Sequence, residues 1–338
     1  MLSRHSFQRR GREKRNWGRG IFPFSPCLRS LGLTAPAKLI AQSAISHIES
    51  QSRNGGFMKI HHLNCGCMCP IGGALFDGFS RGPKAHLVCH CLLIETEQGL
   101  VLIDTGFGLR DIKSPYSRLS PFFIHFNGIQ FDKKYTAIEQ VERLGFSPRD
   151  VRHIVLTHLD FDHAGGLEDF PEATVHVMQT EIENAQDRHG FIGKRRYRPE
   201  QWDEVKHWKY YSAGGEHWFG FEAVRNLDGL PPEILLIPLV GHTRGHAGIA
   251  IDTPEGWLLH AGDAYFYRHE MDSAKKSCTP GLRAYQWMME VDRQARLLNQ
   301  DRLRALSSDR NKGVRLFCSH DAIEFKAFAD QSSTTRQK

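Results

Sequence analysis

The sequence predicts an α/β fold, and three observations support that class. From Met58 onward, short apolar runs typical of strands alternate with segments of helical periodicity. Gly, Pro and other turn residues bound most of these runs. Several runs end directly in His or Asp, which places polar side chains at the ends of strands. At 338 residues the chain is long enough to bury a sizeable core.

The individual elements follow from these patterns in chain order. Residues 85–96 and 100–105 are predicted as two strands joined by the turn Glu97-Gln98-Gly99. The other expected strands are residues 151–157, 173–178, 234–239, 247–252, 256–261 and 314–319. Helical spacing predicts a helix over 136–144 and a long one over 283–306, whose apolar face would carry Trp287, Val291, Ala295, Leu298 and Leu306.

Residues 1–57 differ from the rest of the chain in charge. They hold ten Lys or Arg and two Asp or Glu, a local charge of +8, whereas the whole chain carries +6. We expect a disordered basic extension, or upstream sequence translated before a natural start at Met58. A targeting peptide is the alternative, with Ala35-Pro36-Ala37 as its cleavage site. The remaining 281 residues carry −2, so they lack the excess of cations that nucleic-acid binding requires.

The expected domain spans residues 58–330 and contains one unusual stretch. Residues 180–233 hold nine aromatic side chains among many charges and show few clean periodicities. One hypothesis is that this insertion packs against the domain and supports either the core or a dimer contact. The other is that it forms a lid or pocket wall that selects the substrate. Residues 331–338 are predicted to form a disordered tail. No run of about eighteen apolar residues occurs, so we expect no transmembrane helix.

The eight cysteines do not show the paired knuckles of a structural zinc site. Cys65, Cys67 and Cys69 alternate, which would put them on one face of a strand. We interpret the cysteines as reduced, mostly buried thiols of a cytoplasmic protein. A peripheral metal or redox role for residues 65–69 is the alternative.

The most informative segment runs from His158 to His163 in the sequence His-Leu-Asp-Phe-Asp-His. Four potential metal ligands fall within six residues, directly after an expected strand. Imidazole and carboxylate donors suit a borderline or hard divalent cation. The following Gly165-Gly166 allows a tight backbone turn. This pattern predicts a metal site at the end of a strand.

Three other strand ends carry residues of the same kind. His242 and His246 follow the strand 234–239, Asp263 follows 256–261, and His320 follows 314–319. Isolated histidines are often satisfied core residues, but four strand ends with ligand-type side chains indicate one shared site at one edge of the sheets. The segments IDTG, THLDFDHAGG, GHTRGH, GDA and SHD, in this order, resemble the metal-binding signature of metallo-β-lactamase-fold hydrolases.

The resemblance covers about residues 59–325 and implies a four-layer αββα sandwich with a dinuclear site at the sheet edge. It is nearest to the N-acyl-homoserine lactonase branch. Two divalent ions are implied, with zinc expected and iron or manganese as alternatives. By this resemblance His158, Asp160 and His246 would hold the first ion, and Asp162, His163 and His320 the second, with Asp263 bridging. His242 would be structural and would not touch a metal.

Two positions depart from the family pattern. The usual H-x-H-x-D-H motif has a second histidine where this chain has Asp160. An added carboxylate lowers the positive charge of the centre and so weakens its Lewis acidity, or else Asp160 misses the metal and leaves a mononuclear site. The lactonase branch also has a tyrosine three residues after the bridging aspartate, where this chain has Phe266 between Tyr265 and Tyr267.

We therefore predict a metal-dependent hydrolase that uses a metal-bridging hydroxide to cleave an ester-type bond in a small molecule, with a lactone as the leading substrate. Asp162 would accept a hydrogen bond from the nucleophile, and Tyr265 or Tyr267 would steady the oxyanion. Thioester and phosphotriester hydrolysis remain alternatives. Asp160 also suggests a diiron redox protein as an alternative. A further alternative is a binding protein whose metal site is inactive. No nucleic-acid or membrane partner is expected, and a homodimer is compatible with the sequence.

Overall fold

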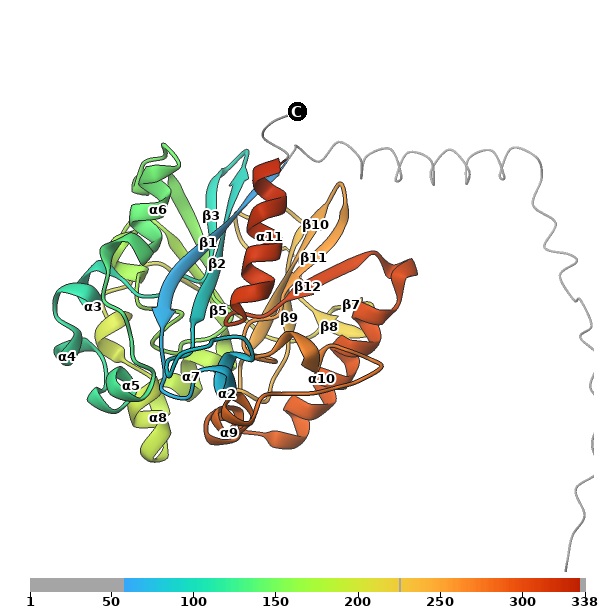
Figure 1. The fold of residues 1–338 in the computed structure, drawn as a ribbon. Helices are drawn as coiled ribbons and strands as arrows, with labels where there is room; N and C mark the ends of the chain where they lie inside the picture. The colour runs from blue at the N-terminus through green and yellow to red at the C-terminus, as the bar shows by residue number, and fades with distance from the viewer. Residues whose placement is uncertain (1–57, 225, 335–338) are drawn as a thin grey trace, which may run out of the picture. The chain divides into compact units, whose positions relative to one another are not determined.

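The computed structural model describes residues 58–224 and 226–334. In this part of the chain two β-sheets pack face to face between two layers of helices (Figure 1). The expected α/β class and the αββα arrangement are confirmed. The expectations for residues 1–57 lie outside the described residues.

The first sheet has six strands in sequence order. β1 to β3 pair antiparallel and β3 to β6 pair parallel. Its strands are β1 (Lys59–Met68), β2 (Leu87–Thr96), β3 (Gly99–Ile103), β4 (Val151–Val155), β5 (Thr174–Met178) and β6 (Trp208–Tyr211).

The second sheet has four strands in the order β12-β11-β10-β9. β12 pairs parallel with β11, and the other two pairs are antiparallel. Its strands are β9 (Ile234–Pro238), β10 (Ala247–Thr253), β11 (Gly256–His260) and β12 (Val314–Phe317). A separate hairpin joins β7 (Glu216–Trp218) to β8 (Phe221–Ala223).

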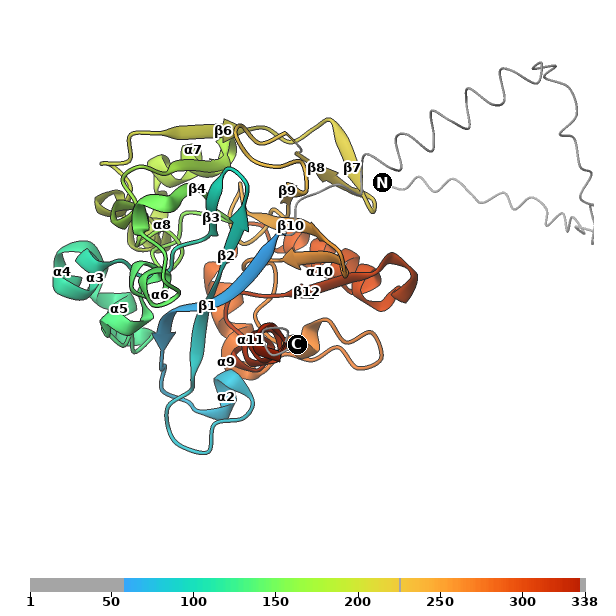
Figure 2. The same cartoon turned by 90° about the horizontal axis from the view of Figure 1, so that it is seen from above.

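The core lies between the sheets and beneath the helices on either side. In β2, Leu92 and Ile94 pack against the second sheet, whereas Cys91 and Leu93 face the outer helices. This division follows from the two-residue period of a strand. On the other side, Leu303 joins an apolar cluster on the outer face of the second sheet. Figure 2 shows α10 lying outside that sheet.

The helices fall into two outer layers and a group near one edge of the sheets. α6 and α7 contribute to the cluster on the first sheet, α10 to that on the second, and α11 contacts β1 and β2. The helices are α2 (Ala74–Asp77), α3 (Leu109–Lys113), α4 (Pro115–Arg118), α5 (Pro121–Phe126), α6 (Ala137–Arg143), α7 (Gln179–Asp187), α8 (Gly190–Arg196), α9 (Pro280–Met289), α10 (Arg293–Ser308) and α11 (Ala322–Thr334). Short 3₁₀ turns are η1 (Lys133–Tyr135), η2 (Pro148–Asp150), η3 (Leu167–Asp169), η4 (Pro199–Gln201), η5 (Arg268–Glu270) and η6 (Arg310–Lys312).

The prediction of a single long helix over 283–306 is wrong, because the helix is interrupted between the end of α9 at Met289 and the start of α10 at Arg293. The side chain of Asp292 accepts a hydrogen bond from the amide of Ala295 and so caps a new helix. The amides of Val291 and Asp292 both donate to the carbonyl of Gly241. The apolar face predicted for this helix is also wrong in part, since Trp287 is 69% and Leu298 58% exposed.

Two further expectations concern segments outside the two sheets. The insertion 180–233 is packed into the domain, because it supplies β6 to the first sheet and the buried Trp218 to the core of the second. Residues 331–334, expected to belong to a disordered tail, instead end α11.

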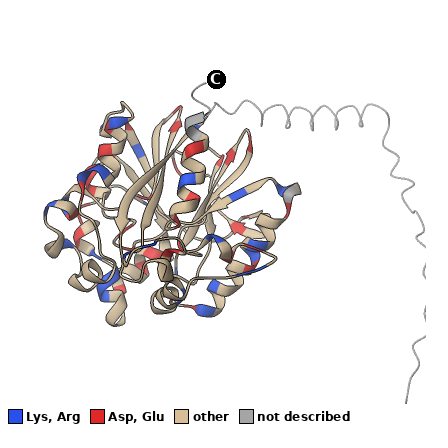
Figure 3. Ribbon diagram, in the orientation of Figure 1, with Lys and Arg blue, Asp and Glu red and all other residues tan. Residues whose placement is uncertain are grey.

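Charged side chains of both signs are interleaved along the visible helices (Figure 3). This mixture fits the near-neutral charge of the residues after the extension. Among the described residues, no helix has the length and apolar character needed to span a bilayer.

Candidate metal centre

Histidines and aspartates from four loops meet at one edge of the two sheets. The loop after β4 carries His158 to His163, and the loop after β9 carries His242. Asp263 follows β11, and His320 follows β12. All of these side chains are buried. The sequence-based prediction of a shared edge therefore agrees with the placement of the strand ends.

The donor atoms form overlapping groups in which all atoms lie within 4.8 Å of one another. One group comprises His158, Asp160, His242 and Asp263. A second comprises His163, Asp263 and His320. Asp162 joins His320 in a third group, together with the thiol of Cys89. Asp263 belongs to both main groups, which is the position expected for a bridging carboxylate.

His163 is oriented by a buried aspartate that comes from the end of β3. Asp104 Oδ2 lies 2.8 Å from His163 Nδ1, and the amide and hydroxyl of Thr157 also donate to this carboxylate. Asp104 has a φ of 55°, an uncommon value for a residue other than glycine. This contact turns Nε2 of His163 toward Asp263.

The other two histidines of the centre are held in the same way. His320 Nδ1 lies 2.7 Å from the carbonyl of Val88, and His158 Nδ1 lies 2.9 Å from the hydroxyl of Thr157. Each Nε2 therefore faces the carboxylates. A fixed Nδ1 partner is typical of metal-binding imidazoles.

Several buried atoms of the centre lack the partners that buried polar groups ordinarily have. Among the described residues, His158 Nε2, His163 Nε2 and Asp263 Oδ1 have no hydrogen bond of good geometry. They lie on two different loops and point into the same space. Imidazole nitrogens and a carboxylate oxygen arranged in this way fit a divalent metal ion. The residues present therefore fit the implied metals.

The contacts of the two histidines in the GHTRGH segment differ from those that the resemblance implies. His246 Nδ1 lies 2.9 Å from the carbonyl of Leu239, and its Nε2 accepts a 2.8 Å hydrogen bond from the amide of Asp263. Both ring nitrogens of His246 are therefore occupied by backbone groups. His242 is the one whose Nε2 joins the donor cluster. The geometry therefore places Nε2 of His242, and not that of His246, among the donor atoms, and His246 positions Asp263.

Asp160 is paired with an arginine that sequence reasoning did not single out. Arg196, at the end of α8, approaches the carboxylate with a planar two-point contact: Nε lies 2.5 Å from Oδ1 and Nη2 lies 2.5 Å from Oδ2. Arg196 Nη2 also donates to His242 Nε2 at 2.7 Å. Both side chains of the pair are almost fully buried. Asp160 thus lies within the donor cluster, but both of its carboxylate oxygens accept hydrogen bonds from Arg196.

These contacts set the protonation of the buried acids. Burial alone would raise the pKa of Asp160, but the positive charge of Arg196 outweighs it and holds that pKa well below its ordinary value. Burial likewise opposes ionisation of Asp263, yet His320 and His163 hold its pKa well below the usual range. For Asp162, burial outweighs the charges of the more distant His163 and His320, so its pKa is raised.

The tyrosines expected to face the substrate point elsewhere. The hydroxyl of Tyr265 donates to the carboxylate of Glu324, and that of Tyr267 contacts Arg268. Tyr285 of α9 instead lines a narrow pocket together with His320. Its hydroxyl accepts a hydrogen bond from Asn127 at 3.2 Å. Burial and the charge of Asp162 raise the pKa of Tyr285 well above its ordinary value, so it remains a proton donor.

The sequence pattern that defines the metallo-beta-lactamase superfamily matches residues 86–298 of the chain. This range includes every loop of the centre except the one that carries His320. The chain belongs to the metallo-β-lactamase superfamily.

Proteins similar to this chain are described as hydrolases. A protein of Mycobacterium tuberculosis described as a probable metallo-hydrolase is 39% identical over 264 residues, which is 78% of this chain and 80% of that protein. An N-acyl homoserine lactonase of Bacillus thuringiensis is 30% identical over 218 residues, 60% of this chain and 76% of the lactonase. The chain is accordingly a metallo-hydrolase of the superfamily.

Solved structures support the same fold. An N-acyl homoserine lactone hydrolase, with the product N-hexanoyl-L-homoserine bound at its catalytic metal centre, superposes with a TM-score of 0.59 at 22% identity. The match covers 80% of this chain and 96% of that one. A dizinc quorum-quenching lactonase matches with a TM-score of 0.50 at 17% identity, covering 79% and 88%. At these identities the likeness concerns the fold.

The burial of Glu324, which contacts Tyr265, predicts that the free energy of unfolding depends on pH. Burial, followed by the charge of Asp321, raises the pKa of Glu324 to about 8. Because the folded pKa exceeds the ordinary value of 4.5, the contribution of this group to stability is greatest below about pH 4.5 and declines as pH rises toward 8. A tenfold change in an acid dissociation constant corresponds to about 1.4 kcal/mol. The Glu324→Gln variant, which keeps the side-chain shape, should therefore lose less stability than wild type as pH rises.

Urea unfolding at pH 5.5 and pH 8.5 measures this difference. The free energy of unfolding of wild type should fall more steeply than that of the variant. Parallel pH profiles would show that Glu324 is ionised in the folded protein.

Proposed function

We propose that this chain is a metal-dependent hydrolase that opens the ester bond of a lactone. The observation that carries the proposal is the convergence at one buried edge of His158 Nε2, His163 Nε2 and Asp263 Oδ1, none of which has a hydrogen bond of good geometry. The lactonase relative, aligned over 76% of its own length, supports the choice of substrate class.

We propose two divalent ions, zinc in the first place, which when bound would activate a water molecule and polarise the substrate carbonyl. His158, His242 and Asp263 would hold one ion, with Arg196 no longer donating to His242 Nε2 when that nitrogen binds the metal. The other would be held by Asp162, His163, Asp263 and His320. Cys89 adds a thiol on the side of Asp162.

Within the centre, Asp162 is the carboxylate suited to proton transfer. Arg196 neutralises Asp160, and Asp263 lies within 3.2 Å of His320. Asp162 has only looser contacts, with 3.6 Å to His320 Nε2 and 4.0 Å to His163 Nε2. Asp162 therefore has the fewest close contacts among the carboxylates of the centre, and we propose that it accepts the proton of the nucleophile.

Arg196 changes the charge that Asp160 was expected to impose. Asp160 adds one negative charge relative to the histidine of the family motif, and Arg196 places one positive charge 2.5 Å away. The pair therefore leaves the net charge of the centre where a histidine would leave it. We infer that this centre keeps the Lewis acidity required for hydrolysis, rather than the weaker one expected from Asp160 alone.

A narrow, mostly apolar pocket of about 10 Å³ reaches His320, and we propose that it widens to receive the substrate. Met68, Leu87, Phe266 and Leu282 contribute apolar walls. Tyr285 supplies a hydroxyl in this pocket, and we propose that this group, rather than Tyr265 or Tyr267, donates to the carbonyl oxygen as negative charge develops.

Replacing Tyr285 by phenylalanine should lower kcat by about 100-fold, the cost typical of losing one oxyanion donor. KM should change less, because the hydrogen bond strengthens in the transition state. Steady-state lactone hydrolysis measures both constants. The Tyr267→Phe variant is the matched control and should retain its kcat. An equal loss in both variants would contradict the role given to Tyr285.

The substrate class is tested by assaying one preparation against lactones, thioesters and phosphotriesters, with oxygen consumption followed in parallel. Lactone hydrolysis should have the highest kcat/KM. A preference for thioesters or phosphotriesters would move the chain to another hydrolase class. Oxygen uptake with bound iron would support the redox alternative that Asp160 suggested.

A further inference from the structure

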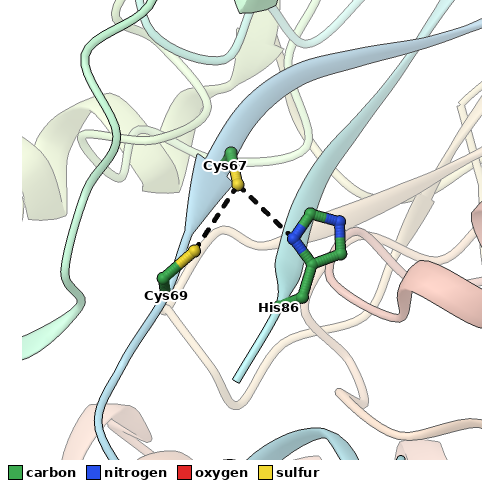
Figure 4. A group of neighbouring side chains, drawn as sticks. All are labelled: Cys67, Cys69 and His86. Atoms are coloured by element: carbon green, nitrogen blue, oxygen red, sulfur yellow. Dashed lines mark hydrogen bonds between the residues drawn. The ribbon is translucent and has the colours of Figure 1, made fainter. Parts of the chain in front are cut away.

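A second group of metal-ligating side chains lies outside the centre described above. Cys67, near the end of β1, and Cys69, just beyond it, direct their sulfurs toward His86, which precedes β2 (Figure 4). Cys67 Sγ lies 3.7 Å from Cys69 Sγ and 3.5 Å from His86 Nδ1. All three donor atoms lie within 4.8 Å of one another.

These spacings match the edges of a zinc coordination tetrahedron. With Zn–S bonds of about 2.3 Å and a Zn–N bond of about 2.05 Å, tetrahedral angles put two sulfurs about 3.8 Å apart and a sulfur and a nitrogen about 3.6 Å apart. The two measured edges that involve Cys67 agree with these values. Cys69 and His86 are half-buried, so small side-chain rotations can adjust the third edge.

The backbone holds the three residues in place. The carbonyl of Cys67 accepts a hydrogen bond from the amide of Gln130, and the amide of Cys69 donates to the carbonyl of Gly128. The amide of His86 donates to the carboxylate of Asp77 at 2.8 Å. Donors that are fixed before binding lose little conformational entropy when an ion binds.

We propose that Cys67, Cys69 and His86 form a separate zinc site, with the fourth position open to water or to an external ligand. Two thiolates and a neutral imidazole balance the charge of one Zn²⁺ ion. Soft sulfur donors also favour zinc over the harder cations that carboxylates bind. Met68 lies between the two cysteines in the sequence, and Leu87 follows His86. Both residues belong to the wall of the substrate pocket. The ion would therefore fasten the ends of β1 and β2 on one side of that pocket.

Cobalt titration of the full-length, metal-free protein under a reducing agent tests this site, because thiolate ligands give Co²⁺ a charge-transfer absorption that His and Asp ligands do not. Wild type should show the band and bind one more equivalent of cobalt than the Cys67→Ser/Cys69→Ser variant. The variant should lose the part of the band that Cys67 and Cys69 contribute and keep at most the part that Cys89 gives. The Cys278→Ser variant, which removes a half-buried thiol elsewhere, is the control and should keep both.

Zinc content and thermal unfolding complete the test. Wild type should retain one more zinc ion per chain than the double variant after dialysis, and added zinc should raise its Tm more. A band of undiminished intensity in the double variant would belong to another thiol such as Cys89 and would overturn the proposal. So would equal zinc contents, or a Cys67–Cys69 disulfide in freshly purified protein. None of these outcomes depends on which substrate the chain hydrolyses.

Discussion

Replacing Arg196 by methionine is expected to lower the free energy of unfolding by about 3–5 kcal/mol, the usual cost of leaving a buried charge without its partner. In the variant, the carboxylate of Asp160 would remain buried beside the imidazoles of His242 and His158, without the guanidinium that now balances its charge. The same change should alter metal binding, because Arg196 contacts Nε2 of His242, the atom proposed to bind an ion. Urea unfolding and metal analysis of the purified variant measure both effects.

Arg195→Met is the matched control, because it makes the same chemical change one residue earlier in α8. Arg195 stacks on Phe191 near the surface and donates to the carbonyl of that residue. Its replacement should cost less than about 1 kcal/mol. The double variant Asp160→His/Arg196→Met restores the family's histidine and should recover most of the lost stability. If Arg196→Met unfolds no more easily than Arg195→Met, the buried pair does not have the role assigned to it.

The His163→Ala variant is expected to lose metal-dependent turnover by at least about 1000-fold, because several kcal/mol of transition-state stabilisation come from the metal site. Metal content should fall in the same preparation. Asp104→Asn should have a smaller effect, about 10- to 100-fold, since Asp104 acts by orienting His163. Lactone hydrolysis with metal analysis of each variant provides the comparison.

A histidine outside the centre serves as the control for these variants. His189 is largely exposed and pairs with Asp187. Its replacement by alanine should leave metal content and turnover unchanged. Turnover in His163→Ala at the wild-type level would remove the basis for a metal centre at this edge.

The fold was predictable because its strands carry strong local signals. The eight strands expected from apolar runs are present, with ends shifted by a few residues. The long helix was not predictable, since the cap formed by Asp292 and the acceptor at Gly241 depend on tertiary contacts. Likewise Trp287 and Leu298 show helical spacing, but spacing alone does not indicate which face is buried.

The candidate site was predictable where its residues follow strands, as His158, His163, Asp263 and His320 do. The choice of His246 over His242 as a ligand rested on the resemblance alone, because both histidines follow the same strand and only the backbone around Asp263 distinguishes them. Arg196 stands in a basic run, Lys194-Arg195-Arg196, without a sign of which cation is buried. Tyr285 lies on a helix with no motif of its own, and the position of α9 alone brings it to the pocket.

We propose that the sheet-edge centre binds metal and hydrolyses a lactone. The most direct measurement is the metal content and lactone turnover of one preparation before chelation, after chelation and after zinc is restored. The Cys67→Ser/Cys69→Ser variant is the protein to use, so that only this centre is counted. We expect two zinc ions per chain, loss of turnover on chelation and its return with zinc. Turnover that survives complete removal of metal would contradict the account.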